Sequence, residues 1–548
     1  MHWCEIHLKD SRWAKSEDDT TQLRVKGPVY WDDAPCTSEG LSDHLSRAQK
    51  NSDLAVSLNR LNGFYAWVEQ TPGRIRAAVD HIRSRPLFYA NYDGRFFLSD
   101  DAEWVRQQVG DREMDLVARE EFQLAGYVTG AETLFPNVKQ LQAGEFLVAK
   151  KQGDGMTLGT HRYYRFLHSE PKRVDEPELR GRLDKVAVTS IQRLIDYANG
   201  RQIVVPLSGG YDSRLIVTLL KRLGCSNILT FTYGVPGNKD STYSKRVADA
   251  LGLRWHFVEY SEALWRQAWQ TPARWEYQKW ASGGSSIAMV HDWLAVRIMT
   301  EQRVLDSDCV FVPGHTGDFI SGGHIPKNTF QRSRFNLEDA TGAVFSKHYG
   351  LAPRRFLEIS KENWSERILH RMERDSIEFA PDYADVCEKW EWQERQAKFI
   401  CNSVRVYEFF GYDWWMPLWD TDFVGFWAGA PLALRKDRQW YKEYVGDQFE
   451  SLAGDQFSKR LLNASDPTGL SAWLKNSPFG TLLKNVQLLR IIAKKFLAMR
   501  KRYKDPQARY GRFPSDQSAA LSRKGFSLVG QVAYFFIEEL NRHLRASS

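Results

Sequence analysis

A loop of small and polar residues follows an apolar run in the segment IVVPLSGGYDSRL, residues 203–215. When a buried strand ends in such a loop and a helix begins directly after it, unpaired backbone N–H groups meet the positive end of the helix dipole and bind anions. Gly209 and Gly210 allow unusual dihedrals and a close approach of the backbone to a ligand. The hydroxyls of Ser208 and Ser213 can donate to phosphate oxygens. The segment therefore predicts a phosphate-binding loop.

An acidic residue, Asp212, stands inside this loop. Phosphate would repel its carboxylate, so we expect the side chain to act through a cation. Mg²⁺ is held in nucleotide sites by one or two carboxylates together with phosphate oxygens. The pattern thus predicts a Mg²⁺ ion that neutralises a bound triphosphate.

Two common nucleotide-binding loops are excluded by the spacing of these residues. The Walker loop requires GxxxxGK[ST], and no lysine follows the glycines at that distance. The dinucleotide fingerprint GxGxxG is also missing from the segment. The letters SGGYDS instead resemble the SGGxDS signature of the PP-loop ATP pyrophosphatases, which cleave ATP to AMP and pyrophosphate.

The elements around the loop must hold it at the edge of a sheet. From residue 178 onward, segments of helical period alternate with short apolar runs. Strands separated by helices of this length form a parallel, doubly wound sheet with covering helices. Expected helices cover 178–200, 212–224 and 241–252, and expected strands cover 202–207, 227–234, 254–260 and 307–314. From about residue 330 the sequence is rich in tryptophan and is expected to be helical.

The region before residue 165 follows a different period. Apolar and polar residues alternate there, which predicts antiparallel sheet, and Asp93 with Gly94 marks a hairpin turn. A charged stretch with two prolines, 168–181, then separates this region from the helical one. We expect a domain over 1–165, a linker over 166–181, a second domain over 182–475 and a basic helical extension over 476–548.

Further segments resemble one family within the PP-loop group, the asparagine-synthetase-like amide-forming ligases, whose relatives include beta-lactam synthetase and lasso peptide cyclase. Residues 231–260 resemble its second strand with the loop, helix and strand that follow. PGHTGDFISGG, 313–323, is similar to its SGEGSDEVFGG loop, which closes over the nucleotide. LNGFYAWV at Leu61, RSRPLFYA at Arg83 and the segment 126–149 are similar to its N-terminal glutaminase-type domain.

The resemblance implies a fold and a set of site residues. The fold is an α/β protein with an N-terminal glutaminase-type α+β sandwich, then a doubly wound parallel-sheet PP-loop synthetase domain, then a helical C-terminal extension. ATP and Mg²⁺ are the implied cofactors, and Asp212 and Asp318 are the implied metal ligands. The nucleotide-binding positions are Leu207, Ser208, Gly209, Gly210, Asp212, Ser213, Tyr233 and Gly314.

The N-terminal domain departs from the glutamine-using members of the family. They carry cysteine at position 2, whereas this chain has His2, and an internal residue such as Cys4 lacks the free α-amine that activates the thiolate. Their Asn-Gly-Glu loop is also missing from the first 60 residues. We expect a retained fold without glutaminase chemistry. The nitrogen nucleophile would then be free ammonia, ammonia from a partner, or an amine of the substrate.

A second departure lies in the closing loop, where His315 replaces an acidic residue that helps to deprotonate the nucleophile. A histidine with an ordinary pKa of about 6.5 can act as a general base at neutral pH. An equally open interpretation is that His315 only hydrogen-bonds the loop.

A third departure concerns a lysine near the C-terminal end of the family's synthetase domain, which stabilises the negative charge of the leaving pyrophosphate. Lys442 and Lys459 are the candidates, and Lys459 is preferred.

The residues in which this signature differs from that of asparagine synthetases suggest the carboxylate substrate. Tyr211 and Arg214, with PGHTGDF and the segment 405–427, resemble a branch associated with bacterial surface polysaccharide (O-antigen) biosynthesis, in which uronic acids become uronamides. The alternatives are an asparagine synthetase acting on aspartate, an intramolecular cyclase of the beta-lactam or lasso peptide type, and a nucleotide-binding pseudoenzyme. Trp414, Trp415 and Trp419 could stack on sugars, but a tryptophan-rich core is the preferred interpretation.

The composition of the chain limits which binding partners and which cellular location are expected. A net charge of +7 over 548 residues is a mild excess, and no nucleic-acid recognition motif accompanies it, so we expect no nucleic acid. The six cysteines form no Cys-x-x-Cys pair, and neither a signal peptide nor an uncharged apolar run long enough to span a membrane is present, so a cytoplasmic location is expected. Residues 484–504 carry lysines and arginines without acids. A solvated helix face is preferred there, with peripheral membrane contact as the alternative.

Overall fold

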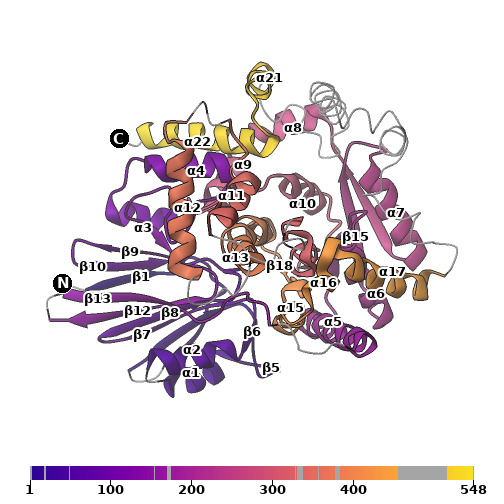
Figure 1. The fold of residues 1–548 in the computed structure, drawn as a ribbon, viewed down its shortest axis with the longest axis horizontal. Coiled ribbons are helices and arrows are strands. Elements are labelled where there is room, and N and C mark those ends of the chain that lie inside the picture. Colours follow the sequence, from indigo (N-terminus) through magenta and orange to yellow (C-terminus); the bar gives the residue numbers. More distant parts are fainter. Residues whose placement is uncertain are drawn as a thin grey trace.

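An antiparallel sandwich and a parallel sheet with covering helices lie side by side (Figure 1). The structure is a computed structural model and describes residues 3–17, 20–48, 50–153, 155–169, 175–327, 329, 337–353, 355, 357–376, 383–454 and 515–546. The sandwich comes first in the chain and the parallel sheet second, as the sequence predicts.

The N-terminal part is layered as helix, sheet, sheet and helix. Its elements are β1 (Cys4–His7), β2 (Ala14–Glu17), β3 (Gln22–Lys26), β4 (Val29–Trp31), β5 (Ala34–Pro35), α1 (Ser38–Ser46), α2 (Asn51–Asn59), β6 (Leu61–Gly63), β7 (Ala66–Thr71), β8 (Arg74–Val79), β9 (Phe88–Tyr92), β10 (Arg95–Ser99), α3 (Ala102–Val109), α4 (Leu116–Ala125), β11 (Lys139–Gln140), β12 (Glu145–Gln152) and β13 (Gly155–Arg162). One sheet has the order β13-β12-β8-β7-β3-β2, the other β1-β10-β9-β11, and a small third sheet β5-β4-β6.

Alternation along the strands explains why both faces of the larger sheet are covered. Ala77 and Leu147 belong to the core between the two sheets, whereas their neighbours Ala78 and Phe146 pack in the cluster that contains the leucines of α1 and α2. Successive side chains of a strand point to opposite faces, so one strand contributes to two cores. The expected turn at Asp93 and Gly94 joins β9 to β10.

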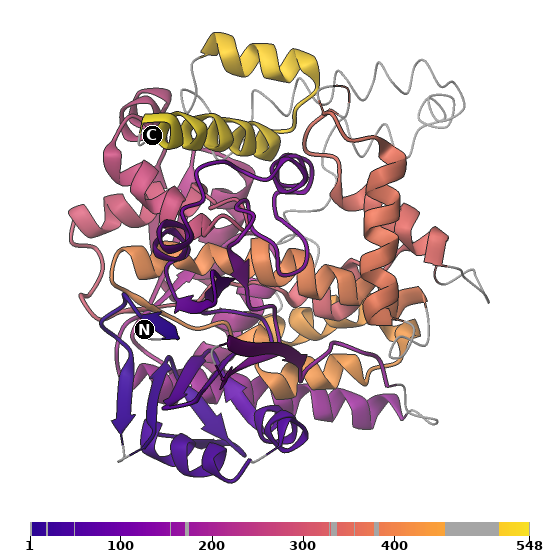
Figure 2. The same cartoon turned by 90° about the vertical axis from the view of Figure 1, so that its left-hand side faces the viewer.

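Helices cover the outer face of the smaller sheet, and one of them comes from the far end of the chain. Phe88 and Phe97 of this sheet share a core with α3, α4 and the C-terminal helix α22 (Leu528–Ala546). The rings of Phe122 and Phe536 stack with centroids 5.5 Å apart. Figure 1 and Figure 2 both show α22 lying across the N-terminal helices, so the end of the chain is packed onto its beginning.

The second part is built on five parallel strands in the order β16-β15-β14-β17-β18. Its elements are α5 (Glu176–Ala198), β14 (Ile203–Pro206), α6 (Asp212–Arg222), β15 (Ile228–Gly234), α7 (Lys239–Leu251), β16 (Arg254–Glu259), α8 (Glu262–Trp269), α9 (Pro272–Ser282), α10 (His291–Glu301), β17 (Val310–Phe311) and β18 (Asp413–Trp414). Helices α5, α6 and α7 pack together on one face of the sheet and α10 lies on the other, which confirms the doubly wound expectation (Figure 1).

A helical region follows the parallel sheet and continues to the end of the chain. Its elements are η1 (Phe319–Gly323), α11 (Leu337–His348), α12 (Lys361–Ser376), α13 (Tyr383–Trp390), η4 (Glu391–Ile400), η5 (Cys401–Val404), α14 (Arg405–Phe409), η6 (Pro417–Trp419), α15 (Thr421–Ala428), α16 (Leu432–Arg435), η7 (Lys436–Arg438), α17 (Gln439–Ala453), α21 (Ser515–Lys524) and α22. Among the described helices, none combines the length and apolar character that a membrane-spanning segment needs.

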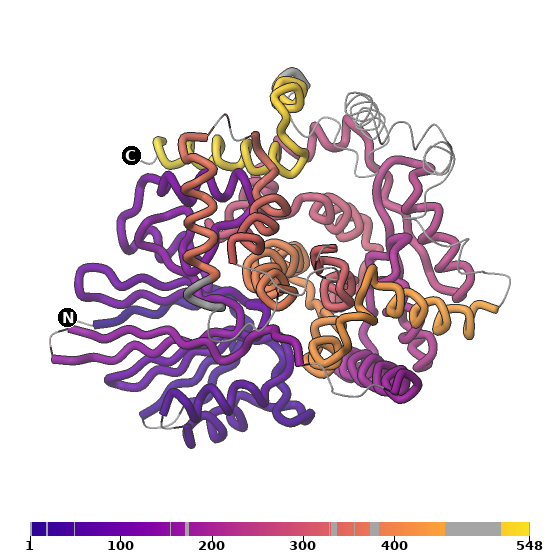
Figure 3. The backbone as a smooth tube through the Cα atoms, in the orientation of Figure 1, coloured from indigo at the N-terminus to yellow at the C-terminus, as the bar shows by residue number. Residues whose placement is uncertain are grey.

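The helical run 383–409 passes between the sandwich and the parallel sheet (Figure 3). Its middle, η4, is wound as a π-helix, a form that is rare and frequently lies at functional sites. It also binds the sandwich: the indole N–H of Trp392 donates to the carbonyl of His81 at 2.7 Å, and Glu394 accepts from the Gly130 N–H at 3.1 Å. The run therefore connects the two parts.

A second contact between the two parts is a cluster of buried charges, which we call the seam: Lys26, Arg85, Arg405 and Glu408. Arg85 and Arg405 donate to Glu408 at 2.8 and 2.7 Å, and the ammonium of Lys26 lies 4.0 Å from the same carboxylate. Burial raises the pKa of Glu408, but these cations outweigh it and lower the pKa to about 2. Glu408 is thus ionised and held from both parts of the chain.

Two expectations differ from the structure. The fifth strand β18 lies in the tryptophan-rich region that we expected to be wholly helical. Helix α5 begins at Glu176, inside the stretch that we expected to be a linker, because Asp175 caps its first turn and Pro177 suits that turn. Trp414, Trp415 and Trp419 are almost completely buried, which confirms the preferred interpretation of a tryptophan-rich core. The basic segment 484–504 and the boundary at 475 lie outside the described residues.

Candidate active site

The segment between β14 and α6 forms a tight loop closed by two serines. The Ser208 N–H donates to the Ser213 hydroxyl at 3.2 Å, the two hydroxyl oxygens are 3.3 Å apart, and the Gly210 N–H donates to Ser208 at 3.2 Å. The Leu207 N–H is bound to the Phe231 carbonyl of the neighbouring strand. Neither glycine of the loop has a positive φ, so their role is close approach rather than unusual dihedrals.

A second loop, residues 313–318, reaches over the first from the end of β17. A Cβ atom at Gly314 would lie 2.7 Å from the Ser213 nitrogen, and one at Gly317 would lie 2.6 Å from the Asp212 carboxyl carbon. No side chain fits at either position. The two glycine-rich segments are therefore in direct backbone contact, and this contact brings Asp212 beside Asp318.

Thr316 occupies a strained position in the second loop. Its φ is +84°, a conformation that a β-branched residue rarely adopts. Such strain costs of order 1–3 kcal/mol and persists where surrounding contacts enforce it. Here Gln396 of η4 accepts from the Thr316 hydroxyl at 3.2 Å. The π-helix between the two parts thus helps to hold the closing loop.

Asp212 is half-buried and is held from one side only. Its Oδ1 accepts from the Arg438 guanidinium at 2.7 Å and from the Tyr441 hydroxyl at 2.9 Å. Its Oδ2 makes no hydrogen bond to any residue that the structure describes. Burial and the charge of Asp318 raise the pKa of Asp212, against the opposing effect of Arg438.

Asp318 has a different environment. Its carboxylate lies 3.1 Å from His324 Nε2, and the other ring nitrogen lies 2.6 Å from the buried Glu391. Burial raises the pKa of Asp318, but the hydrogen bond and charge of His324, with Arg438 and Arg395 beyond, lower it to about 2. His324 therefore orients this carboxylate.

These two carboxylates fit a magnesium ion bound together with phosphate. Asp212 offers Oδ2, and the Asp318 side chain is 46% exposed. Among the described residues, no group of three or more His, Cys, Asp or Glu side chains could hold a metal alone. Mg²⁺ retains water and takes one or two protein carboxylates plus substrate phosphates, so two carboxylates beside a phosphate-binding loop are sufficient.

His315 is half-buried and uncharged. Its Nε2 lies 3.2 Å from the Ser403 hydroxyl. Burial lowers the pKa of His315 to about 4, even though Asp318 acts in the opposite direction. The ordinary pKa expected from the sequence is therefore not found, and the neutral ring offers a lone pair of low basicity.

Tyr233 and Gly314 lie at the ends of the strands on either side of β14. The Tyr233 hydroxyl donates to Asp292 Oδ1 at 2.5 Å, and the Tyr407 hydroxyl donates to Asp292 Oδ2 at 3.3 Å. Asp292 is half-buried in the first turn of α10. The sequence gives no signal for it, because nothing near residue 292 resembles a motif.

The cation beside the phosphate-binding loop is an arginine that the sequence interpretation missed. Arg438 bridges Asp212 and the Ser321 hydroxyl, the second at 2.9 Å. The ammonium of Lys442 is instead bound to the carbonyl of Asp437 at 2.8 Å, on the exposed side of α17. Lys459 lies outside the described residues. The run RKDR before α17 is the signal that could have identified Arg438.

Tyr211 and Arg214, the two unusual residues of the signature, contact each other on the side of the loop that faces the protein interior. Arg214 is 2% exposed, and its guanidinium approaches the Gly209 carbonyl at 3.4 Å and stacks over the rings of Tyr211 and Phe449. Arg214 therefore braces the loop from inside the protein. Any influence on substrate choice would act through the shape of the loop, without direct contact.

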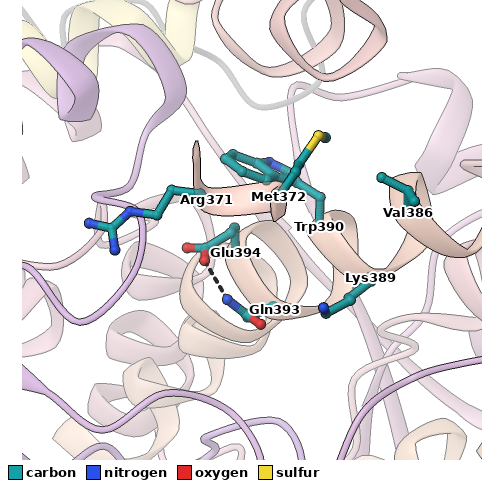
Figure 4. Close-up of a pocket in the computed structure, with 7 residues that line it drawn as sticks. All are labelled: Arg371, Met372, Val386, Lys389, Trp390, Gln393 and Glu394. Atoms are coloured by element: carbon teal, nitrogen blue, oxygen red, sulfur yellow. Dashed lines mark hydrogen bonds between the residues drawn. The ribbon is translucent and has the colours of Figure 1, made fainter. Parts of the chain in front are cut away.

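A small cavity lies beside η4, apart from the two loops (Figure 4). Its volume is about 20 Å³, which is room for about one water molecule. Glu394 at its edge accepts from Gln393 at 2.8 Å and from Lys398 at 2.5 Å. The lining residues are Arg371, Met372, Val386, Lys389, Trp390, Gln393 and Glu394. The cavity is too small for a nucleotide, so it is not the site.

Two family models match the chain. The model described as asparagine synthase matches residues 198–485. The model described as a glutamine amidotransferase domain matches residues 50–164. The first match spans more than half of the 548 residues and contains both loops. A comparison with curated proteins finds no match.

Solved structures resemble parts of the chain at low identity. The allosteric regulatory enzyme of purine biosynthesis is 12% identical over 45% of this chain and 62% of its own, with a TM-score of 0.19. Glutamine phosphoribosylpyrophosphate amidotransferase from B. subtilis is 12% identical over 55% of this chain and 63% of its own, with a TM-score of 0.19. NH3-dependent NAD synthetase from Campylobacter jejuni subsp. jejuni is 14% identical over 42% of this chain and 96% of its own, with a TM-score of 0.22. The chain thus spans less than two thirds of the first two proteins, and the family assignment rests on the family models.

Proposed function

This chain belongs to the asparagine synthase family, and from that premise we propose that it is an ATP-dependent ligase that converts a carboxylate to an amide through an acyl-adenylate. The observation that carries the proposal is the contact between the two loops. It places the serines of the phosphate-binding loop, Asp212 and Asp318 at the carboxyl edge of the parallel sheet. Ligands of open α/β sheets bind at this edge.

The first step activates the carboxylate. One of its oxygens attacks the α-phosphorus of ATP, the bond from that phosphorus to the bridging oxygen breaks, and pyrophosphate leaves with the electron pair. The backbone N–H groups and the hydroxyls of Ser208 and Ser213 hold the departing phosphates. Mg²⁺, when bound by Asp212 and Asp318, neutralises part of their charge. The acyl group now carries AMP, a far better leaving group than hydroxide.

Arg438 supplies a cation to this step. Its guanidinium contacts Asp212 directly, and a planar fork of donors suits phosphate oxygens. The Nη1 group of Arg438 makes no hydrogen bond to a residue that the structure describes, so it can donate to the pyrophosphate. A preorganised cation at the leaving group is what the chemistry requires. Arg438 thus takes the role that the sequence interpretation gave to a lysine.

The second step forms the amide. The lone pair of a neutral nitrogen attacks the acyl carbon, the C–N bond forms, and the C–O bond to the AMP phosphate breaks with its electron pair going to AMP. The nitrogen then loses one proton. His315 lies in the closing loop, and the negative charge of the nucleotide beside it would raise its pKa from the low value of the free site. It can then accept this proton.

The substrate that we propose is a sugar carboxylate, a uronic acid that becomes a uronamide. Support comes from the letters SGGYDSR and PGHTGDF, which resemble the uronamide-forming branch.

The test is the release of pyrophosphate and AMP across a panel of carboxylates. The panel contains aspartate, free uronic acids and nucleotide-linked uronic acids, each with ammonium and with glutamine. We expect release with a uronic acid and ammonium, and none with glutamine. Turnover of aspartate in place of any sugar acid would refute the substrate, and turnover of a peptide without added nitrogen would favour a cyclase. ATP binding without release in any arm would refute the ligase.

A further inference from the structure

A carboxylate without a cationic partner lies in the wall of the site, and Tyr407, which donates to it, lies about one helical turn from Ser403, which contacts His315. We propose that Asp292, together with Tyr233 and Tyr407, binds the nitrogen nucleophile in its ammonium form. The ligand class is an ammonium ion or a primary ammonium group. This inference rests on the proposed function and adds to it the place where the nitrogen is held.

The contacts of Asp292 leave its charge uncompensated. Both carboxylate oxygens accept hydrogen bonds from tyrosine hydroxyls, at 2.5 Å from Tyr233 and 3.3 Å from Tyr407. Within the part of the chain that the structure describes, no lysine, arginine or histidine forms an ion pair with this carboxylate. Buried or partly buried carboxylates are normally paired with a cation. A cationic ligand would complete the site.

Aromatic rings surround this carboxylate. The ring of Tyr233 stacks on that of Tyr260 with centroids 5.1 Å apart, and the ring of Tyr407 stacks on Phe311 with centroids 4.2 Å apart. Ring faces attract ammonium groups, and a carboxylate within an aromatic wall is the usual chemistry of ammonium recognition. Burial raises the pKa of Asp292 while the tyrosine hydroxyls lower it, and a bound cation would favour the ionised form.

The wall also fixes where the ammonium would lie. Ser403 contacts His315, and Tyr407 contacts Asp292. These two residues are four apart on the helical segments η5 and α14. Segment η5 is a 3-10 helix that runs directly into α14, so the two contacting residues are carried about one helical turn apart. An ammonium at Asp292 is therefore held close to His315 and to the closing loop.

The chemistry at this site must remove a proton before attack. The bound ammonium gives one N–H proton to a base, and the resulting lone pair attacks the acyl carbon of the adenylate. The C–O bond to AMP then breaks, AMP takes the electron pair, and the nitrogen loses a second proton. In this proposal Asp292 holds the cation, and His315 of the closing loop is the candidate base. No further reactant is needed.

The experiment compares Asp292→Asn with the wild-type chain in two reactions. Pyrophosphate exchange into ATP with the carboxylate found by the panel measures the first step, and amide formation at increasing ammonium chloride measures the second. We expect exchange within twofold of wild type and a KM for ammonium raised at least tenfold. Tyr407→Phe should raise the KM less, because one hydrogen bond to the carboxylate remains. Methylammonium in place of ammonium tests whether the site accepts a primary amine.

Controls make each outcome decisive. Glu301→Gln removes a carboxylate from the exposed end of the same helix, where Glu301 pairs with Arg297, and should change neither reaction. An unchanged KM for ammonium in Asp292→Asn would overturn the inference, as would a raised KM for ATP, which would place Asp292 at the adenine. A thermal-stability increase with ammonium over sodium chloride, lost in Asp292→Asn, supports the site even if no carboxylate undergoes exchange. Failure of exchange in the wild-type chain would refute only the proposed function.

Discussion

The seam and the candidate active site, which comprises the two loops with Asp212, Asp318 and Asp292 and which we call the cleft, use the same residue types in opposite ways. At the seam, Glu408 receives two guanidinium groups and the indole N–H of Trp414, and its own side chain is completely buried. In the cleft, Asp212 keeps one oxygen without a hydrogen bond to a described residue, and Asp292 accepts from hydroxyls alone. Charges that hold the fold are saturated by partners, whereas charges that can bind a ligand are left incomplete.

The N-terminal part and the parallel-sheet part of the chain differ in the same way: one supports the fold, and the other retains the arrangement needed for ligand binding. The N-terminal part keeps its sandwich, but the thiol pKa of Cys4 is raised by burial, so this cysteine is not an activated nucleophile. The parallel-sheet part keeps the loop contacts in which any side chain at Gly314 or Gly317 would clash. We infer that the N-terminal part supports the fold through the seam and that the chemistry belongs to the cleft.

The largest effect is expected from Asp212→Ala in the cleft. Loss of a metal-binding carboxylate at the phosphates should lower carboxylate-dependent pyrophosphate exchange about 1,000-fold. Asp249→Ala, which removes an exposed carboxylate paired with Lys245, is the matched control and should retain full exchange. Unchanged exchange in Asp212→Ala would show that the incomplete carboxylate is not the metal ligand.

At the seam, Glu408→Gln should act on stability. It leaves the guanidinium groups of Arg85 and Arg405 buried without their counter-charge, which costs about 3–5 kcal/mol of unfolding free energy. Denaturant unfolding measures this loss. Exchange per folded molecule should stay close to wild type below the unfolding temperature. If exchange disappears while stability is retained, the seam takes part in catalysis and the contrast between the regions fails.

Arg438→Ala should have a smaller effect on the cleft than Asp212→Ala. Removal of a preorganised cation at the leaving group should lower exchange about 100-fold and weaken inhibition by pyrophosphate. Arg438→Lys should restore part of the rate, because the charge returns without the planar fork. A full loss of exchange in Lys442→Ala, with Arg438→Ala unaffected, would assign the role to the lysine instead.

The most gradual effect expected is a change of stability with pH, caused by two histidines. The folded chain holds the pKa of His315 at about 4 and that of His348 at about 3, in both cases because burial disfavours the charged ring. The unfolded chain takes up these protons near pH 6.5, so it binds more protons than the folded chain below that pH. Stability should therefore be complete above about pH 6.5 and fall as the pH drops towards 4.

Substitution of each histidine separates its contribution to the pH dependence of stability from that of the carboxylates. His315→Gln should flatten the loss by up to about 1.4 kcal/mol per pH unit between pH 6 and 4, and His348→Gln should do the same. Unfolding free energy measured at each pH gives the slope. An unchanged slope in both variants would mean that these rings titrate normally.

Much of the fold follows from the local pattern of residues. The alternation of helices and strands from residue 178 predicts β14, β15 and β16, because their apolar runs are long enough to show a period. Strand β18 has two residues, Asp413 and Trp414, and no period can be seen in so short a segment. Its pairing with β17 bridges about a hundred residues of sequence and depends on tertiary packing.

Some residues of the candidate site could also be predicted from the sequence, and others could not. Residues 207–213 and 313–318 could be predicted because each loop is continuous in sequence. Arg438 and Asp292 reach the site from distant helices, and their types alone do not distinguish them from surface residues. The pKa of His315 also could not be predicted, because it depends on burial by residues far along the chain.

The central claim is that a carboxylate becomes an acyl-adenylate in the cleft. The most direct measurement uses a carboxylate labelled with ¹⁸O in both oxygens, with ATP and ammonium, followed by mass spectrometry of the nucleotide product. Attack on the α-phosphorus predicts AMP that carries one labelled oxygen and an amide that keeps the other. Unlabelled AMP, or label in inorganic phosphate with ADP as the nucleotide product, would contradict the claim.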